Sequence, residues 1–359
     1  MNSLKENLKF TQVLIIGSGI VGKFNALELA KLGLKVLIID PCQSKNSSNA
    51  ALGILMGKIY QKRNGRSWEL RKTSMKLWPD WLKEFKEINP KVDFEKPLIK
   101  MTTNDDYFEK MKKFVLKYPN DNLKILQEKS NLLVNIQNVF NNNKIKGIIS
   151  YEDGRINPKI LLNTIDSLLK KYSITTINNA VFEIKKDKKS WIAFLKGGNK
   201  IVAEVVILCN SLKSLELIES KKYNLALEPV LGQAIEISIK DKSTNFLNLP
   251  KVFSINGKNI IPLSRNKLII GSTDEFDTKP QQEKIKELTE FIKEKPNWLD
   301  TKNITKKWFG IRSKPIGEGS PLLKTLETGL ILCTGFYKNG ILLAPASSKW
   351  VSQEVQKHI

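Results

Sequence analysis

Residues 13–40 read VLIIGSGIVGKFNALELAKLGLKVLIID, and this stretch decides the fold of the first part of the chain. Its first four residues are apolar and mostly β-branched, which is typical of a buried parallel strand. Gly17, Gly19 and Gly22 follow with the G-x-G-x-x-G spacing. In such a turn the first glycine permits the tight bend, the second lets a pyrophosphate approach the backbone, and the third lets the helix pack on the strand. The stretch therefore predicts strand, glycine-rich turn, helix and second strand.

Asp40 ends the second predicted strand, 18 residues after the last glycine. The helix, beginning near Ile20 and Val21, directs free N–H groups and a partial positive charge at phosphates. A carboxylate in the position of Asp40 accepts hydrogen bonds from ribose hydroxyls. The stretch therefore predicts a site for the ADP half of FAD or NAD. The alternative is a glycine-rich turn in an ordinary βαβ unit, and this stretch alone does not separate FAD from NAD.

The size and composition of the chain are those of an ordinary globular protein. Its 359 residues are 41% hydrophobic and 26% charged, and they suffice for two domains. No uncharged apolar run reaches about 18 residues, so no membrane-spanning helix is expected. The apolar stretch near the N-terminus resembles a signal peptide, but its cleavage would destroy the glycine-rich turn, so we expect a cytoplasmic protein. The three cysteines form no C-x-x-C pair, which excludes a redox dithiol and a zinc ribbon of that type.

The formal net charge is +23, and the chain has a single histidine, His358. A charge of this sign favours a polyanionic partner or an anionic membrane surface. The lysines are nevertheless scattered in short groups on amphipathic segments, so a lysine-rich composition accounts for them, and nucleic-acid binding is not expected. With its one histidine next to the C-terminus, the chain has no Ser-His-Asp triad and no histidine-rich metal site. We expect no metal, and a cofactor that carries the chemistry.

Hydrophobic periodicity predicts the remaining elements. Helices are expected at residues 61–87, 105–117, 158–172, 283–295 and 345–355. Strands are expected at residues 147–157 (strand, then turn), 174–184, 191–195, 200–208, 232–239, 268–272 and 330–333. The run AEVVIL at residues 203–208 is again typical of a buried parallel strand. The nucleotide domain therefore resumes near the middle and the end of the chain, with mostly antiparallel segments between.

Five further segments carry distinctive patterns. The last is TGFYKNGILLAPA at residues 334–346. Before it come RSWELRKTSMKLWPDW, EDGRINP, GSTDE and WFGIRSKPIGEGSP, at residues 66–81, 152–158, 271–275 and 308–321. In this order they resemble the motifs of the D-amino-acid oxidase superfamily, and most closely those of the glycine oxidase branch associated with thiamine biosynthesis. Together with the glycine-rich turn, the resemblance spans nearly the whole chain.

The resemblance implies FAD as the cofactor and an α/β fold (α+β overall), with a Rossmann-like FAD-binding domain and an inserted substrate domain on a mixed, largely antiparallel sheet. It implies an FAD domain at residues 1–88, 145–215 and 305–359, and a substrate domain at residues 89–144 and 216–304. The implied reaction oxidises the C–N bond of a small amino acid or amine. Hydride passes to flavin N5, the imine hydrolyses, and molecular oxygen or another acceptor takes the electrons. Assembly into a homo-oligomer is left open.

The same resemblance assigns roles to individual residues. Arg312 matches the arginine that pairs with the substrate carboxylate, for which a guanidinium supplies a bidentate fork. Lys338 is a second candidate cation. A helix beginning near Gly340 would place its positive end at the flavin N1–C2=O. The expected cofactor-binding residues are Gly17, Gly19, Ile20, Val21, Gly22, Asp40, Ser47, Ser48, Asn49, Gly53, Val181, Gly335, Asn339, Gly340 and Ile341.

Three residues depart from the family motifs. Phe336 stands where histidine is common, Lys338 where arginine is common, and Asn259 where a carboxylate-binding tyrosine is expected. The carboxylate clamp therefore depends on Arg312, because lysine is a point charge and not a fork. Glycine itself is for this reason not assumed as the substrate. Three alternatives stay open: a dehydrogenase that uses a quinone or carrier, a flavin enzyme acting on a modified tRNA nucleoside, and a flavoprotein without turnover.

Overall fold

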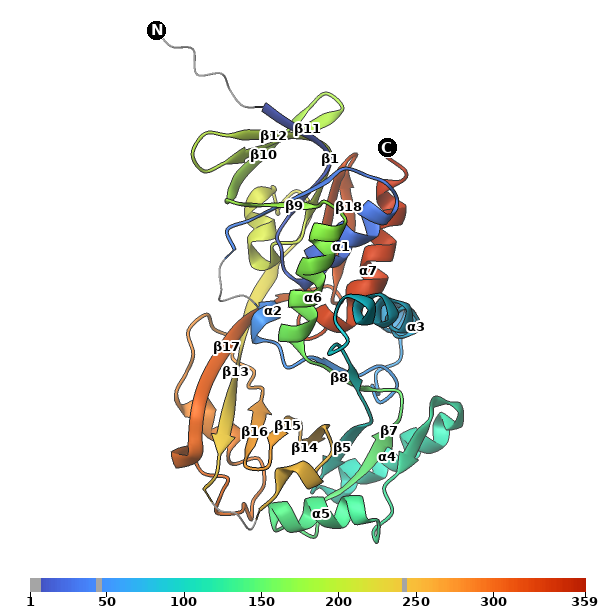
Figure 1. Ribbon diagram of the computed structural model, residues 1–359, viewed down its shortest axis with the longest axis vertical. Helices are drawn as coiled ribbons and strands as arrows, with labels where there is room; N and C mark the ends of the chain where they lie inside the picture. The colour runs from blue at the N-terminus through green and yellow to red at the C-terminus, as the bar shows by residue number, and fades with distance from the viewer. Residues whose placement is uncertain (1–7, 43–46, 241–243) are drawn as a thin grey trace.

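The computed structural model describes residues 8–42, 47–240 and 244–359. The parts of the expected domains at residues 1–7, 43–46 and 241–243 lie outside the described residues. Figure 1 shows two large sheets toward opposite ends of an elongated molecule, with a group of helices beside the upper one. No helix in the described part of the chain is both long and apolar enough to cross a bilayer.

The first sheet is built around β1 (Leu8–Ile16), which pairs in parallel with β2 (Val36–Asp40) and with β12 (Lys200–Leu208). On the outer sides, β9 (Thr175–Asn178) and β19 (Leu330–Thr334) continue the parallel arrangement. Antiparallel strands complete the sheet, namely β10 (Val181–Asp187), β11 (Ser190–Leu195) and β18 (Leu322–Glu327).

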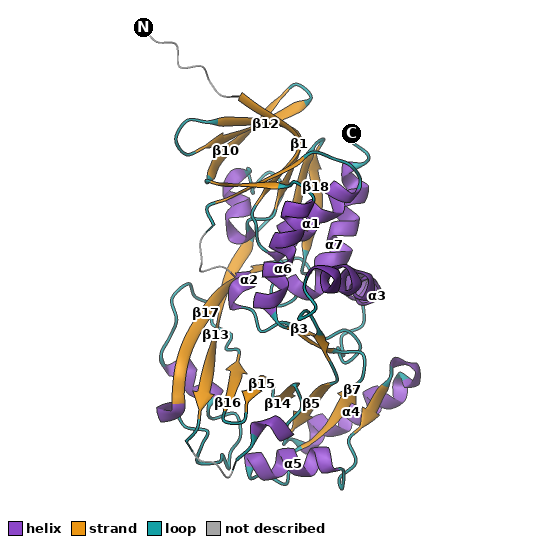
Figure 2. Cartoon of the chain, in the orientation of Figure 1, coloured by secondary structure: helices purple, strands orange, loops and turns teal. Residues whose placement is uncertain are grey.

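Both faces of this sheet are buried, which explains the unbroken apolar runs of its central strands. Val13 and Ile15 face one side, where helices pack on them. Leu14 and Ile16 face the other, where they join a cluster with Trp191. The helices lie together beside the sheet (Figure 2) and are α1 (Ile20–Lys31), α3 (Gly65–Ile88), α6 (Pro158–Lys171) and α7 (Gly340–Val355).

The second sheet is antiparallel except where β14 pairs with β5 in parallel. From one edge to the other its strands are β17 (Ile304–Pro315), β13 (Leu227–Ser238), β16 (Lys267–Gly271), β15 (Lys258–Ser264), β14 (Val252–Ile255), β5 (Leu98–Thr102), β7 (Lys146–Ser150) and β6 (Leu123–Ile125). This mixed, largely antiparallel sheet beside a parallel one confirms the predicted fold class.

Shorter elements complete the architecture. On the second sheet pack α4 (Asp105–Lys117) and α5 (Asn131–Phe140). A small sheet contains β3 (Ile54–Leu55), β8 (Gly154–Ile156) and β4 (Phe94–Glu95). The one-turn helix α2 is Ser47–Ala50. The 3₁₀ turns are η1 (Pro119–Asp121), η2 (Ser211–Leu217), η3 (Phe246–Asn248), η4 (Glu283–Leu288) and η5 (Thr301–Asn303).

Two expected elements differ from the structure. The helix predicted at residues 283–295 is wrong beyond η4, because residues 289–295 form turns and bends, and in this segment the Phe291 carbonyl accepts a hydrogen bond from Asn256 Nδ2 (2.8 Å). The strand predicted at residues 174–184 is two strands, β9 and β10. It breaks at Asn179, whose backbone N–H donates to the Asp40 carbonyl (3.2 Å).

Two of the expected domain boundaries fall beside strands of the other sheet. The strand β7 lies within residues 145–215, and all of β17 except Ile304 lies within residues 305–359, yet both pair inside the second sheet. We propose boundaries after residues 150 and 315, where these strands end, so that each large sheet belongs to one domain.

The Asp153 side chain, in the turn before β8, accepts hydrogen bonds from the backbone of the segment that follows β3. Its Oδ1 accepts hydrogen bonds from the backbone N–H of Gly57 (2.7 Å) and Lys58 (2.9 Å), and its Oδ2 accepts one from Ile59 (2.6 Å). The side chain is completely buried. Burial raises the pKa of the Asp153 carboxyl, and the three backbone donors oppose that rise. This buried acceptor therefore satisfies three donors of a non-helical segment.

We predict that Asp153→Ala lowers the free energy of unfolding by about 3 kcal/mol or more, because each buried donor without an acceptor costs about 1–3 kcal/mol. Urea-induced unfolding measures the change. The matched control is Glu152→Ala, since the neighbouring Glu152 side chain is 41% exposed. Its effect should stay within about 0.5 kcal/mol. Equal losses in the two variants would contradict the role given to Asp153.

Candidate cofactor and substrate site

The glycine-rich turn is packed so closely that two of its positions accept no side chain. Gly17 has a φ of +111°, and a Cβ on it would lie 2.7 Å from the carbonyl carbon and oxygen of Cys209. A Cβ on Gly22 would lie 1.9 Å from the Gly17 carbonyl oxygen. The turn thus brings β1, β12 and the start of α1 into direct backbone contact. This is the close approach that the G-x-G-x-x-G spacing predicts.

Asp40 lies at the end of β2, beside this turn. Its Oδ2 accepts a hydrogen bond from the Ser18 backbone N–H (2.7 Å), and its Oδ1 accepts one from the Cys42 N–H (2.6 Å). An ionised carboxylate offers about four lone-pair positions. Both oxygens therefore keep acceptor capacity for the hydroxyls of a ribose, while the backbone bonds fix the orientation of the group.

A cavity of about 670 Å³ extends along the carboxyl ends of β1 and β2. This volume is within the range of about 300–1,000 Å³ that is usual for ligand pockets. Cys209 and Cys333, at the ends of β12 and β19, also line it. The predicted site residues in its wall are Gly17, Gly19, Ile20, Val21, Asp40, Ser47, Ser48, Val181, Gly340 and Arg312.

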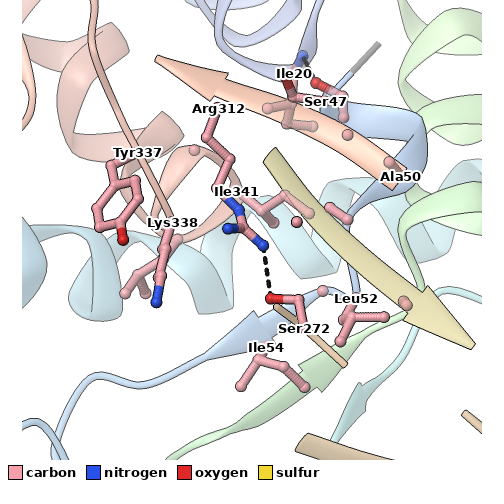
Figure 3. Close-up of a pocket in the computed structure, with 18 of the residues that line it drawn as sticks. Ile20, Ser47, Ala50, Leu52, Ile54, Ser272, Arg312, Tyr337, Lys338 and Ile341 are labelled. Atoms are coloured by element: carbon pink, nitrogen blue, oxygen red, sulfur yellow. Dashed lines mark hydrogen bonds between the residues drawn. The ribbon is translucent and has the colours of Figure 1, made fainter. Parts of the chain in front are cut away.

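A second cavity, of about 180 Å³, adjoins the first and is drawn in Figure 3. The predicted residues in its wall are Ile20, Ser47, Ser48, Gly53, Arg312, Lys338, Gly340 and Ile341. The two cavities share Ile20, Ser47, Ser48, Gly310, Arg312, Tyr337 and Gly340. They therefore form one extended site, with a large compartment at the glycine-rich turn and a small one at Arg312.

Four of the predicted residues line neither cavity. Gly22 lies under the turn, against Gly17. Asn49 is exposed. Gly335 has a φ of +69° and packs toward Pro315. Asn339 precedes α7, and its side-chain oxygen accepts a hydrogen bond from Arg71 Nη2 (3.0 Å). These positions shape the walls without facing the cavities.

The N-termini of α1 and α7 meet where the two cavities join. A Cβ on Gly340 would lie 3.8 Å from Ile20 Cγ2. Neither preceding residue, Gly19 or Asn339, caps its helix with a side-chain hydrogen bond. Ile20 N–H donates to Ser48 Oγ (3.0 Å). Each helix end carries unpaired N–H groups and about half a positive charge, so this junction favours electronegative ligand groups.

These features fit FAD. The turn positions that exclude a Cβ allow a pyrophosphate to approach the backbone, and Asp40 offers acceptors to the ribose. The start of α7 would face the electronegative N1–C2=O side of the flavin ring. The cavity-lining residues that would hold the cofactor come from distant parts of the chain, around residues 17–21, 40, 47–53, 181 and 340–341.

Arg312 reaches the small cavity from β17. Its Nη1 donates to Asp274 Oδ1 (3.0 Å) and to the Thr273 carbonyl (3.3 Å), and its Nη2 donates to Ser272 Oγ (2.6 Å; Figure 3). A Cβ on Gly232 would lie 1.9 Å from Arg312 Nη2, so the glycine makes room for the guanidinium. Burial lowers the pKa of Arg312, and Asp274 opposes this effect. The guanidinium nevertheless stays charged, as arginine does in proteins.

Lys338 and Asn259 complete the polar wall of the small cavity. Lys338 Nζ lies 2.5 Å from Asp274 Oδ2. Asn259 Oδ1 is buried and has no hydrogen-bond partner among the described residues. The sequence reasoning missed Asp274, Ser272 and Gly232. Ser272 and Asp274 lie in the GSTDE segment quoted above, and Gly232 lies in the distant PVLGQ segment at residues 229–233, but only the fold shows that both segments meet Arg312.

The chain belongs to a family of FAD-dependent oxidoreductases, whose pattern matches residues 12–354, and FAD is the family's cofactor. Glycine oxidase of Geobacillus kaustophilus (strain HTA426) is 23% identical over 356 residues, covering 96% of this chain and 93% of that protein. Glycine oxidase of Pseudomonas aeruginosa (strain PAO1) is 25% identical over 362 residues, covering 94% and 93%. The crystal structure of glycine oxidase from Geobacillus kaustophilus superposes with a TM-score of 0.82, at 23% identity, over 98% of this chain and 96% of that chain.

We predict that Gly22→Ala weakens FAD binding, because the new methyl group would collide with the Gly17 carbonyl and shift the turn. Overpacking of this kind costs about 1–3 kcal/mol. The measurement is the ratio of flavin to protein absorbance after gel filtration. Gly319→Ala is the matched control, since a Cβ there meets no atom within 4 Å. Full flavin retention by Gly22→Ala would show that the turn tolerates a side chain.

Proposed function

We propose that this protein oxidises the C–N bond of a small amino acid or amine, as a glycine oxidase does. The observation that carries the proposal is the position of Arg312. Arg312 lines both the large cavity that fits FAD and the small cavity beside it, and its guanidinium lies among the residues that line the small one (Figure 3). A planar cation at this junction binds a carboxylate bidentately. A substrate held there would have its α-carbon next to the cofactor compartment.

FAD, when bound, supplies the acceptor for a hydride. The protein's own contribution is to hold and orient the substrate. Arg312 and Lys338 offer cations to a carboxylate, and Asn259 Oδ1 offers an acceptor to an amino N–H. Ala50, Leu52, Ile54 and other apolar residues form much of the remaining described wall, which keeps water away from the reacting atoms.

The described lining of the small cavity contains no carboxylate and no imidazole. A general base that removes a proton from the α-carbon is therefore missing from this lining. Removal of the hydrogen as hydride from a neutral amine needs no such base. This supports an oxidation of the amino-acid oxidase type over chemistry that begins with a carbanion.

The similarity to glycine oxidases extends the proposal to a cytoplasmic enzyme of thiamine biosynthesis. Glycine itself is not specified, because Asn259 and Lys338 replace the tyrosine and arginine of the family pattern. Both replacements weaken the clamp for a simple carboxylate. The proposed substrate class is therefore small primary or secondary amino acids, together with the corresponding amines.

The test is anaerobic mixing of the FAD-loaded protein with a panel of small amino acids and amines. We expect at least one of them to bleach the visible absorbance of the flavin. Reoxidation by oxygen and by an artificial acceptor, measured side by side, then separates an oxidase from a dehydrogenase. A flavin that no primary or secondary amine reduces would refute the proposal and favour a flavoprotein without turnover.

We further predict that Arg312→Gln weakens carboxylate substrates by about 2–4 kcal/mol in kcat/KM, as loss of a charged partner in a buried pair does. Amines without a carboxylate should be affected much less. Lys314→Gln is the matched control, because Lys314 lies on the same strand, lines neither cavity and pairs with Glu228. If both variants kept wild-type kinetics, Arg312 would have no part in substrate binding.

A further inference from the structure

Arg312 and Lys338, the two cations of the small cavity, both pair with the carboxylate of one residue of the protein, Asp274. Arg312 Nη1 lies 3.0 Å from its Oδ1, and Lys338 Nζ lies 2.5 Å from its Oδ2. Tyr337 Oη lies 3.5 Å from the same Oδ1. Asp274 therefore makes the same kind of contacts to Arg312 and Lys338 that the proposed function gives to a substrate carboxylate.

The backbone around Asp274 is fixed, whereas its side chain is not enclosed. Thr273 N–H donates to the Gln233 carbonyl (3.1 Å), and Glu275 exchanges two backbone hydrogen bonds with Leu231 (2.7 and 2.9 Å). Between these anchors, the Asp274 side chain is 40% exposed. Exposed side chains change rotamer on the picosecond to nanosecond scale. The carboxylate can therefore leave Arg312 without any movement of the backbone at residues 273–275.

Within the group formed by Arg312, Lys338, Asp274 and Tyr337, the cations outnumber the anions. Arg312, Lys338 and Asp274 together carry one net positive charge, and Tyr337 is neutral because burial and Asp274 raise its pKa. Among the described residues, Glu275 acts on Arg312 as a further anion, and Lys314 acts on Tyr337 as a further cation. Glu275 is buried and already accepts hydrogen bonds from Gln233 Nε2 (3.0 and 3.2 Å). Lys314 pairs with Glu228.

We propose that Asp274 determines substrate specificity by competing with a substrate carboxylate for Arg312 and Lys338. The inference rests on the proposed function and names the residue that sets the strength of its carboxylate clamp. A ligand must displace Asp274 to gain the bidentate fork of Arg312. Monocarboxylates therefore bind more weakly than the two cations alone would allow, and ligands without a carboxylate are not penalised.

Acetate is the probe, because it carries the carboxylate and cannot be oxidised as an amine. It is titrated into the FAD-loaded wild type and into Asp274→Asn, with binding measured by calorimetry. We expect Asp274→Asn to bind acetate more tightly by up to about five-fold, since an exposed ion pair contributes up to about a factor of five. Methylamine, which lacks the carboxylate, should gain nothing from the substitution.

Further variants separate this role from a structural one. Asp277→Asn is the matched control, because the Asp277 carboxylate accepts hydrogen bonds from the Thr278 and Lys279 backbone and lies outside the cluster. It should bind acetate as the wild type does. Asp274→Glu keeps the charge and should restore weak binding. Asp274→Asn combined with Arg312→Gln should lose the gain, because no fork remains.

Acetate affinity that is equal or weaker in Asp274→Asn would overturn the inference, as would tighter binding that persists without Arg312. These outcomes are independent of turnover. If amino acids reduce the flavin but Asp274→Asn leaves acetate binding unchanged, the inference fails and the proposed function stands. If acetate binding tightens as expected but no amine reduces the flavin, Asp274 competes for the site as inferred and the proposed reaction is wrong.

Discussion

The register of β13 against β17 is the constraint on which the site depends. It places Gly232 opposite Gly310 in a ladder of two 12-residue strands. A Cβ on Gly232 would lie on the Arg312 guanidinium, and one on Gly310 would lie 2.7 Å from Ala50 Cβ. A slip of one residue turns every side chain of a strand to the opposite face. The pairing of β13 with β17 therefore sets the position of Arg312, the space that Gly232 leaves for its guanidinium, and the contact of Gly310 with α2.

The kind of polar group in the wall of the extended site changes from one end of the site to the other. Asp40 supplies acceptors at one end, and Arg312 and Lys338 supply cations at the other. Between them lie the N-termini of α1 and α7, whose N–H groups carry partial positive charge without a mobile side chain. Fixed backbone dipoles of this kind need no reorganisation when charge develops nearby. The fold thus presents an ordered series of acceptors, dipoles and cations to an elongated ligand.

Local patterns in the sequence predicted the strand–turn–helix–strand unit well. Each element between Val13 and Asp40 can be predicted from the spacing of apolar residues within that element. They also predicted α4 with its observed bounds. They failed at residues 289–295, a segment whose contacts include a residue distant in the sequence, since Asn256 Nδ2 donates to the Phe291 carbonyl. The family resemblance pointed to Arg312 and Lys338, but no sequence pattern shows that both contact Asp274, since this depends on how β16, β17 and the turn before α7 meet.

The first sheet is assembled from both ends of the chain, with β1 beginning at Leu8 and β19 ending at Thr334. A ribosome therefore releases the nucleotide-binding turn well before the strand and helix that complete its surroundings. During this interval the apolar side of α1 needs another cover. Phe24 of α1 packs on Trp81 (4.7 Å between ring centroids) and Trp78 (5.7 Å) of α3, which is synthesised soon afterwards. The aromatic cluster of α3 can thus shield the nascent chain from aggregation until α7 arrives.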